Sequence, residues 1–420
     1  MSATTPDKLE TGGYVVVGGG MAGARGAHAL ARATGETVTL VGAEPVLAYD
    51  RTALSKAFLR GEAEEAGISL YRADQWDKSG VRAHLGRTAC GLEPDRKVVV
   101  LEGGAEIGYE QLLVATGRRA RRLEIPGADL DGVLTLRHLA DARALRDRMG
   151  TGGSLVVVGA GFVGLEVAAA GRKGGLCVQV VDVDPVPLAA RLGRIVGARV
   201  RAWHEERGVV FHLGDPPEEM VGTGTVAGLR LAGGGQLGAT VVVVGVGSEP
   251  CAQWVGPLER FPDGTVAVDP AGRTSAAGVW ACGDVASFVH ESFGRVVIEH
   301  ETVAQTHARM VAMAMAGRPS RAPLVPYAWS DQYEHRLEVV GVVDPTGEVE
   351  VLEGAAGGQV VAYGRDDQVT GVAVLDVPGV ASRVLSLMQA GWPLARGALA
   401  GALREAAGRA GAAASGPGGS

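Results

Sequence analysis

One pattern occurs twice in this chain and restricts its fold more than any other feature. Residues 14–17 form a short apolar, β-rich run, followed by GGGMAG, a segment of helical composition at 22–33 and a second apolar run at 37–41. The same order returns at 155–158, GAGFVG, 163–172 and 177–181. Each copy predicts a strand, a tight turn, a helix and a parallel strand, so we expect two βαβ units.

Both glycine-rich segments have the spacing GxGxxG. The first contains Gly18, Gly20 and Gly23, and the second contains Gly159, Gly161 and Gly164. Such glycines let backbone N–H groups approach a pyrophosphate at the positive end of the following helix. Taken alone, either turn could exist only to pack a helix against a sheet. Because both have a strand before and a helix after, we expect two dinucleotide sites.

The end of the second strand of each unit is where a ribose hydroxyl is expected to bind. Asp182 occupies that position in the second unit, and a carboxylate there accepts from a 2'-hydroxyl but repels a 2'-phosphate. Two like charges about 4 Å apart cost about 4 kcal/mol at an effective dielectric of 20, which favours NADH over NADPH. The alternative is that Asp182 only ends a strand and Arg191 accepts a phosphate. In the first unit, Ala43 holds the position and Glu44 follows it.

The length of 420 residues indicates more than one domain. Further strands are expected at 97–101, 111–115, 240–244 and 278–281. Prolines after Pro319 mark a linker, and alternation of period two at 336–343, 348–352 and 369–375 predicts a smaller α+β domain. The last stretch, 406–420, has low complexity and is expected to be a flexible tail.

Composition narrows the class of protein. A net charge of -7 argues against nucleic acid as the main partner. No apolar run is long enough to span a bilayer, no signal peptide is recognisable, and the four cysteines form no metal-binding cluster. We therefore expect a cytoplasmic protein without metal or membrane attachment, as a monomer or weak dimer.

A family resemblance rests on VVVGGGMAG, YDRTALSKAFLRGE, GAGFVGLEVAA, VGVGSEP, VWACGDVA and WSDQYE, which follow one another along the chain. These segments resemble the pyridine-nucleotide-disulfide oxidoreductase superfamily, in particular the FAD-dependent ferredoxin reductases that serve cytochrome P450 and ring-hydroxylating oxygenase systems. The resemblance implies an α/β fold with two Rossmann-like domains of the glutathione-reductase type and a C-terminal α+β domain. It places the FAD-binding domain at 1–117 and 248–322, the NADH-binding domain at 118–247 and the C-terminal domain at 323–405.

The resemblance and the two motifs together give the expected cofactor positions. For FAD these are Gly18, Gly20, Met21, Ala22, Gly23, Ala43, Glu44, Lys56, Ala89, Thr116, Gly117, Arg137, Gly283, Asp284, Glu301, Thr302 and Trp329. For NADH they are Gly159, Gly161, Phe162, Val163, Gly164, Glu166, Asp182, Arg191, Gly245, Val246 and Gly247.

Lys56 and Glu166 are the residues expected to act in the chemistry. In the enzymes that the chain resembles, this lysine lies beside the flavin ring and pairs with a glutamate of the second glycine-motif helix. A cation there stabilises negative charge on the ring, and the pairing offsets the desolvation of a buried charge. The alternatives are a solvated lysine on a helix and a glutamate that only responds to the helix dipole.

The resemblance also implies the electron acceptor. Disulfide reductases of this superfamily carry a redox-active cysteine pair after the first βαβ unit, and this chain has no cysteine between Gly23 and His84. Electrons are therefore expected to leave the flavin directly, for a [2Fe-2S] ferredoxin-type carrier. Two alternatives are an NADH-dependent flavin reductase or oxidase that acts on a small molecule or oxygen, and a non-enzymatic redox-sensing flavoprotein.

Two further features have both a functional and a structural interpretation, and a third departs from the family pattern. Arg118, Arg119, Arg121 and Arg122, with Arg309, either meet an acidic carrier or form a solvated surface. Trp329 either faces the flavin or belongs to the core. Thr52 and Ala53 stand where the family usually has two prolines, which predicts a less rigid loop.

Overall fold

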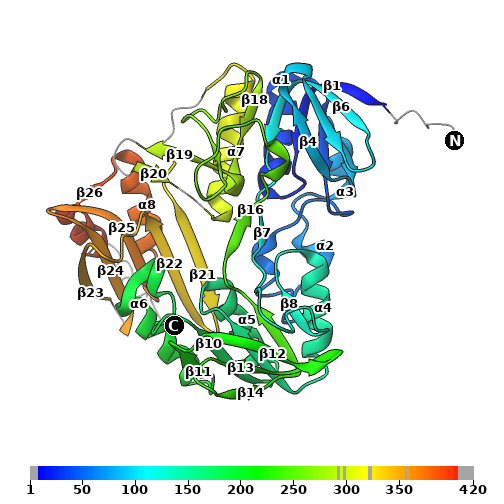
Figure 1. Cartoon of the computed structure of the whole chain (residues 1–420). Helices are drawn as coiled ribbons and strands as arrows, with labels where there is room; N and C mark the ends of the chain where they lie inside the picture. Colours follow the sequence, from blue (N-terminus) through cyan, green and yellow to red (C-terminus); the bar gives the residue numbers. More distant parts are fainter. Residues whose placement is uncertain (1–7, 291–293, 297–298, 320–323, 355–356, 405–420) are drawn as a thin grey trace, which may run out of the picture. The chain divides into compact units, whose positions relative to one another are not determined.

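The computed structural model of the chain describes residues 8–290, 294–296, 299–319, 324–354 and 357–404 (Figure 1). The tail expected at 406–420 lies outside these residues. Contacts divide the chain into two compact units. Unit 1 takes Met1–Thr52, Glu64–Arg119 and Ser248–Leu324, and unit 2 takes Ala53–Ala63, Ala120–Gly247 and Val325–Ser420.

Unit 1 is built on a seven-stranded sheet. Its order is β3 (Val81–Leu85), β2 (Val38–Gly42), β1 (Lys8–Val17), β6 (Glu106–Val114), β5 (Val98–Leu101) and β4 (Ala89–Glu93), while β18 (Val279–Ala281) pairs with β6. The pairs among β3, β2, β1, β6 and β18 are parallel, and β5 and β4 join antiparallel. The first predicted βαβ unit is therefore present.

Both faces of this sheet are covered, which explains why β1 and β6 end in apolar runs, at residues 15–17 and 112–114. Helices α1 (Met21–Thr34) and α7 (Glu301–Met315) pack on the face that contains Val16 and Leu113 (Figure 1). Val15 and Val17 belong to the core on the other face. The smaller elements are α2 (Glu65–Ile68), α3 (Ala73–Asp77), β7 (Arg118–Ala120), β16 (Ser248–Pro250), β17 (Val266–Ala267), β19 (Ala286–His290), β20 (Gly294–Val296) and the 3-10 turns η1 (Arg51–Ala53), η2 (Pro94–Arg96), η3 (Gln253–Val255) and η4 (Gly283–Val285).

Unit 2 contains a five-stranded parallel sheet in the order β11 (Val210–Leu213), β10 (Cys177–Asp182), β9 (Ser154–Val158), β15 (Val241–Val244) and β8 (Val133–Thr135). Its helices are α4 (Leu139–Met149), α5 (Phe162–Lys173) and α6 (Ala189–Glu205). Gly193, at φ +74°, kinks α6. An antiparallel sheet of β12 (Pro217–Thr223), β13 (Thr225–Leu231) and β14 (Gln236–Gly238) was not expected from the sequence.

The C-terminal part of unit 2 is an antiparallel sheet with one helix. Its order is β21 (Tyr327–Gln332), β22 (His335–Gly341), β25 (Gln368–Leu375), β24 (Gln359–Arg365) and β23 (Glu348–Glu353), with β26 (Leu394–Ala395) on β25 and α8 (Val380–Ala390) beside them. Ala328, Leu337 and Tyr363 share one core with Leu165 of α5 and Val196 of α6. This sheet is therefore packed against the helices of the second βαβ unit.

The α/β class expected from the sequence is confirmed, since two parallel sheets follow the two glycine motifs and an antiparallel sheet follows the proline-rich linker. In the described residues, no helix is long and apolar enough to cross a membrane.

Candidate functional site

The first glycine turn joins β1 to α1. Gly18 has a φ of +127°, and a Cβ atom there would lie 2.1 Å from the carbonyl oxygen of Ala115. A Cβ atom on Gly23 would lie 1.7 Å from the carbonyl oxygen of Gly18. The packing of helix against strand therefore requires both glycines. Gly20 is different, because the atoms nearest to its Cβ position belong to the Arg51 guanidinium, the first at 3.5 Å.

The second glycine turn, between β9 and α5, repeats this arrangement. Cβ atoms on Gly159 and Gly164 would lie 2.4 Å from the carbonyl oxygen of Gly245 and 2.0 Å from that of Gly159. No atom lies within 4 Å of the Cβ position of Gly161, whose φ of -81° any residue adopts. Protein packing thus explains the first and third glycines but not the middle one.

The starts of α1 and α5 fit a dinucleotide pyrophosphate. Neither helix has an acidic residue in its first turn, and no side chain caps Gly20 or Gly161. The N-terminal N–H groups and the positive end of the helix dipole are therefore available to an anion, and the middle glycine leaves room for its approach.

The acidic residues expected near the riboses lie beside these turns. Asp182 ends β10, and its carboxylate accepts from the backbone N–H of Ala160 at 2.5 Å and of Asp184 at 2.8 Å. The carboxylate is thus fixed against the second glycine turn. Glu44 follows β2 and accepts from the Tyr49 hydroxyl and the Arg51 guanidinium, each at 2.6 Å.

Gly283 and Asp284, which were also expected to bind FAD, lie near the start of α1. Gly283 has a φ of +70°, and its Cβ position lies 2.8 Å from Cβ of Ala22. Its N–H donates to Nδ1 of His307 on α7 at 3.3 Å, and burial lowers the pKa of His307 from 6.5 to about 4, which keeps the ring neutral. The turn that carries Asp284 is therefore held between α1 and α7, close to the helix start.

Two further turns complete this region. The Thr116 hydroxyl donates to the carbonyl oxygen of Cys251 at 2.6 Å, and Gly117 has a φ of +65°. Glu301 and Thr302 form the first turn of α7, and the Glu301 carboxylate accepts from Gln305.

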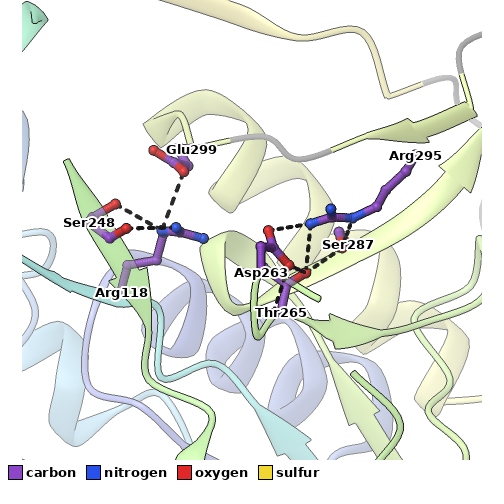
Figure 2. A network of polar contacts seen from close by, with 7 residues as sticks. All are labelled: Arg118, Ser248, Asp263, Thr265, Ser287, Arg295 and Glu299. Carbon is purple, nitrogen blue, oxygen red and sulfur yellow. Dashed lines mark hydrogen bonds and ion pairs between the residues drawn. The ribbon is translucent and has the colours of Figure 1, made fainter. Parts of the chain in front are cut away.

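Arg118 fixes the segment before α7 (Figure 2). Its Nε donates to the Ser248 hydroxyl at 2.8 Å and its Nη2 to the Ser248 carbonyl oxygen at 2.9 Å, while Nε lies 3.3 Å from Glu299. Arg118 is 7% exposed. Arg118 is therefore part neither of a solvated surface nor of a surface that meets an acidic carrier, because its charge is used inside unit 1.

The rest of the arginine run lies at the surface. Arg119 pairs with Glu249 at 3.2 Å, with its side chain 55% exposed. Arg121, Arg122 and Arg309 are also exposed. These four remain candidates for a solvated surface or a docking surface.

A second polar cluster of unit 1, also in Figure 2, follows the Asp284 turn. Arg295 of β20 pairs with Asp263 and donates to Thr265 at 3.1 Å and to Ser287 at 3.2 Å. Thr265 and Ser287 are buried, so these contacts tie β17, β19 and β20 together. Because the members of this cluster bond to one another, we assign it a structural role.

Lys56 and Glu166 form a buried ion pair within unit 2. Lys56 Nζ lies 2.9 Å from Glu166 Oε1, with the side chains 12% and 4% exposed. The carboxylate also accepts from the Ser330 hydroxyl at 2.6 Å and from the Ser55 hydroxyl. A buried charge of this kind is costly unless it is paired and fully hydrogen-bonded, and here Glu166 has three donors.

The alternative of a solvated lysine on a helix does not hold, because Lys56 is largely buried and lies in a segment of turns. Residues 54–61 form successive turns, in which the N–H groups of Lys56 and Phe58 both donate to the carbonyl oxygen of Ala53. Contacts of Ser55 and Lys56 with Glu166 hold this irregular path in place of a helix. Before it, the Asp50 carboxylate accepts from both the N–H and the hydroxyl of Thr52, at 2.8 and 2.7 Å, which restrains the loop without proline.

Some of the remaining expected residues, among them Gly245 and Val246, lie beside the second glycine turn, and the others lie elsewhere. The full set is Ala43 directly after β2, Ala89 on β4, Arg137 before α4, Trp329 on β21, Phe162 and Val163 at the start of α5, exposed Arg191 in the first turn of α6, and Gly245, Val246 and Gly247 after β15. Lys56, Arg137 and Trp329 belong to unit 2, whereas the other positions expected for FAD belong to unit 1. Within each unit the structure brings a glycine turn together with part of its expected set.

Comparison with known proteins decides the family. Residues 13–308 match the family described as pyridine nucleotide-disulphide oxidoreductase, and residues 327–405 match the family described as reductase C-terminal. The chain belongs to the pyridine nucleotide-disulphide oxidoreductase family. It is therefore an oxidoreductase, of a family that uses FAD and NAD(P)H.

Relatives of this oxidoreductase include reductase components of dioxygenase systems. It is 38% identical to the biphenyl dioxygenase system ferredoxin–NAD(+) reductase component of Paraburkholderia xenovorans, over 83% of this chain and 86% of the relative. It is 34% identical to the benzene 1,2-dioxygenase system ferredoxin–NAD(+) reductase subunit of Pseudomonas putida, over 86% and 89%. A crystal structure of the covalent putidaredoxin reductase–putidaredoxin complex contains a similar chain, with a TM-score of 0.88, 27% identity and coverage of 96% and 100%.

The cysteines of this oxidoreductase do not suggest a thiol relay. All four are free, and burial, with the nearby Asp284 charge, raises the pKa of the Cys282 thiol. A raised pKa disfavours the reactive thiolate. In the part of the chain that the structure describes, no group of three or more His, Cys, Asp or Glu side chains could hold a metal ion.

Several residues beside the site were missed by sequence reasoning. Ser55, Ser330 and Arg51 all lie in segments that carried the family resemblance, yet only the structure shows that two of them contact Glu166 and one contacts Glu44. A signal existed for Ser330, because WSDQYE lies in a strand whose alternate residues share one face. No local pattern identifies Ser55.

Proposed function

We propose that this chain is an FAD-containing oxidoreductase that transfers electrons from NADH through the flavin to a [2Fe-2S] ferredoxin-type carrier. The names of the two dioxygenase-system relatives support this, since both are reductases named with a ferredoxin and NAD(+). The structural observation that carries the proposal is on α5. This helix begins at the open turn of Gly161 and carries Glu166, the partner of Lys56, about one turn later.

In this proposal the two glycine turns bind different dinucleotides. The Gly20 turn, with Arg51, Thr116 and Asp284 near it, would hold FAD, and the residues expected for NADH would hold the nicotinamide dinucleotide. The FAD-binding, NADH-binding and C-terminal domains keep the boundaries expected from the sequence. When bound, FAD accepts an electron pair from NADH and releases electrons singly.

The role of the protein is to position and to provide charge. Lys56 would place its ammonium at the flavin ring, where a fixed cation stabilises added negative charge. Glu166 would hold Lys56 in that position and balance its charge. Because the chain has no cysteine pair after the first βαβ unit, electrons would leave the flavin directly. A cytoplasmic location and a monomer or weak dimer remain parts of this proposal.

The experiment is anaerobic mixing of the purified flavoprotein with NADH, followed by addition of an oxidised [2Fe-2S] ferredoxin. NADH is expected to bleach the flavin absorption, and the ferredoxin is expected to be reduced in many turnovers. Turnover with oxygen or a small molecule, and no response to any ferredoxin, would favour the reductase or oxidase alternative. A long-lived complex with NAD and negligible turnover would favour a redox-sensing flavoprotein.

The NADH preference makes a separate prediction about Asp182. Replacing Asp182 by Ala and Val183 by Arg removes the carboxylate and adds a cation at a position that is 65% exposed. The ratio of kcat/KM for NADPH to that for NADH is expected to rise on the order of a hundredfold, because repulsion of the 2'-phosphate is replaced by attraction. Steady-state kinetics with both nucleotides measures it. Asp215→Ala, which removes a half-buried carboxylate from the loop after β11, is the control, and an unchanged ratio in the double variant would refute the role of Asp182.

A further inference from the structure

A chain of buried hydrogen bonds continues beyond Glu166 through unit 2. The Ser330 hydroxyl, which donates to Glu166, accepts from Nε2 of Gln332 at 3.1 Å. The Gln332 carbonyl oxygen lies 2.8 Å from Nε2 of His204, and Nδ1 of His204 lies 3.0 Å from the Tyr333 hydroxyl. The chain thus links α5, β21 and α6 within one compact unit.

The hydrogen bonds of this network are all donated in one direction, from Tyr333 toward Glu166. Carboxylate oxygens of Glu166 accept, so Ser330 must donate to Glu166 and use its lone pair for the Gln332 amide. The Gln332 oxygen is then left to accept from His204. This requires a proton on Nε2 of His204 and none on Nδ1, which accepts from Tyr333. A single neutral tautomer of His204 satisfies every member.

Because these residues are buried, a missing hydrogen bond among them would cost free energy of folding. Ser330, Gln332 and His204 are each 0% exposed. The pKa of His204 is lowered to about 4, mainly by burial and also by Arg207 and His335, although the hydrogen bond to the Gln332 oxygen acts to raise it. The ring therefore stays neutral at ordinary pH, as the direction of the chain requires. A buried polar network whose hydrogen bonds were only partly satisfied would be less stable than an apolar core, so each of these hydrogen bonds matters.

We propose that Gln332 and His204 are positioning residues for the Lys56–Glu166 pair, acting through Ser330. The chain fixes the Ser330 hydroxyl, which holds Glu166 Oε1, the same oxygen that lies 2.9 Å from Lys56 Nζ. Rotation of the carboxylate would move the acceptor away from Lys56, and the chain opposes that rotation. This inference rests on the proposed role of Lys56 and Glu166 in flavin reduction.

The test replaces Gln332 by Leu, which has a similar size and breaks both links. Stopped-flow reduction of the FAD-loaded protein by NADH is expected to slow by roughly tenfold, the effect of one hydrogen bond, with little change in the NADH concentration that gives half-maximal rate. Gln179→Leu is the matched control. Gln179 also bonds a histidine, His212, at 3.1 Å in unit 2, but that pair has no link to Glu166, and its loss should leave the rate within about twofold.

Two further measurements separate positioning from general packing. In a Glu166→Gln background, Gln332→Leu is expected to cause no additional slowing, because its effect passes through the carboxylate. Nitrogen-15 NMR of labelled histidine in the wild type is expected to show His204 protonated on Nε2 alone, and this signal should shift in Tyr333→Phe.

The outcomes decide between the two proposals. If NADH does not reduce the wild type at all, the proposed function fails. If NADH reduces the wild type and Gln332→Leu reacts as fast as the control, the positioning role is overturned, and so it is if the slowing persists undiminished in the Glu166→Gln background. If Gln332→Leu does not fold, Tyr333→Phe decides, since an unchanged rate together with an unchanged His204 signal overturns the role.

Discussion

Replacing Lys56 by Met is expected to slow flavin reduction by NADH by about a hundredfold, because loss of one preorganised charge at a reacting group costs roughly 3 kcal/mol of barrier height. The same change leaves Glu166 buried without its cation, so the free energy of unfolding should fall by about 3 kcal/mol. Stopped-flow absorbance measures the first effect and denaturant unfolding the second. FAD content is measured alongside, so that loss of cofactor is not mistaken for loss of rate.

An exposed pair of the same kind provides the control. Lys97 Nζ lies 2.6 Å from Glu110, but these side chains are 50% and 74% exposed. Lys97→Met should change the free energy of unfolding by less than about 1 kcal/mol and leave the rate unaffected, because solvent screens such pairs. If Lys56→Met reduced its flavin as fast as Lys97→Met, the proposed role of the buried pair would be lost.

The sequence was sufficient for the βαβ units because their signals are local. A buried parallel strand is an apolar run, and the glycines at 18, 23, 159 and 164 are required by contacts within each turn. Strands β9 and β10 were recognisable for the same reason, whereas the antiparallel strands β22 and β25 were recognisable by their alternation of period two. Strands β12, β13 and β14 were not, since each contains a glycine and none is a continuous apolar run.

The network behind Glu166 shows where local reasoning ends. Its members are distant in the sequence, with Ser55, His204 and Ser330 brought to one place only by the packing of α5, α6 and β21. Nothing near His204 in the sequence indicates that its ring is buried. Similarly, Arg118 lies in a run of arginines that is typical of a protein surface. Its partners, Ser248 and Glu299, lie far along the chain, so nothing local in the sequence indicates its burial.

The glycine turns give a second large expected effect, in which neighbouring glycines respond differently to the same substitution. Gly164→Ala places a Cβ atom 2.0 Å from a backbone oxygen that cannot move without separating α5 from β9. We expect it to lower the free energy of unfolding by more than about 4 kcal/mol, a loss as large as severe steric conflicts in a protein core cause. Gly161→Ala meets no atom within 4 Å and should cost less than about 1 kcal/mol.

The substitution that costs little stability, Gly161→Ala, is expected to have the large effect on the affinity for NADH. Gly161→Ala should keep its fold and its FAD but bind NADH at least tenfold more weakly, because a methyl group would occupy the space through which a pyrophosphate reaches the N–H groups of α5. Thermal unfolding measures stability and FAD absorption measures cofactor content. Titration with NAD, which has the same pyrophosphate as NADH but does not reduce the flavin, measures nucleotide affinity. A Gly161→Ala protein with unchanged affinity would mean that the nucleotide does not approach the helix start. The middle glycine would then have neither a packing reason nor a binding reason, and the assignment of this turn to NADH would have to be withdrawn.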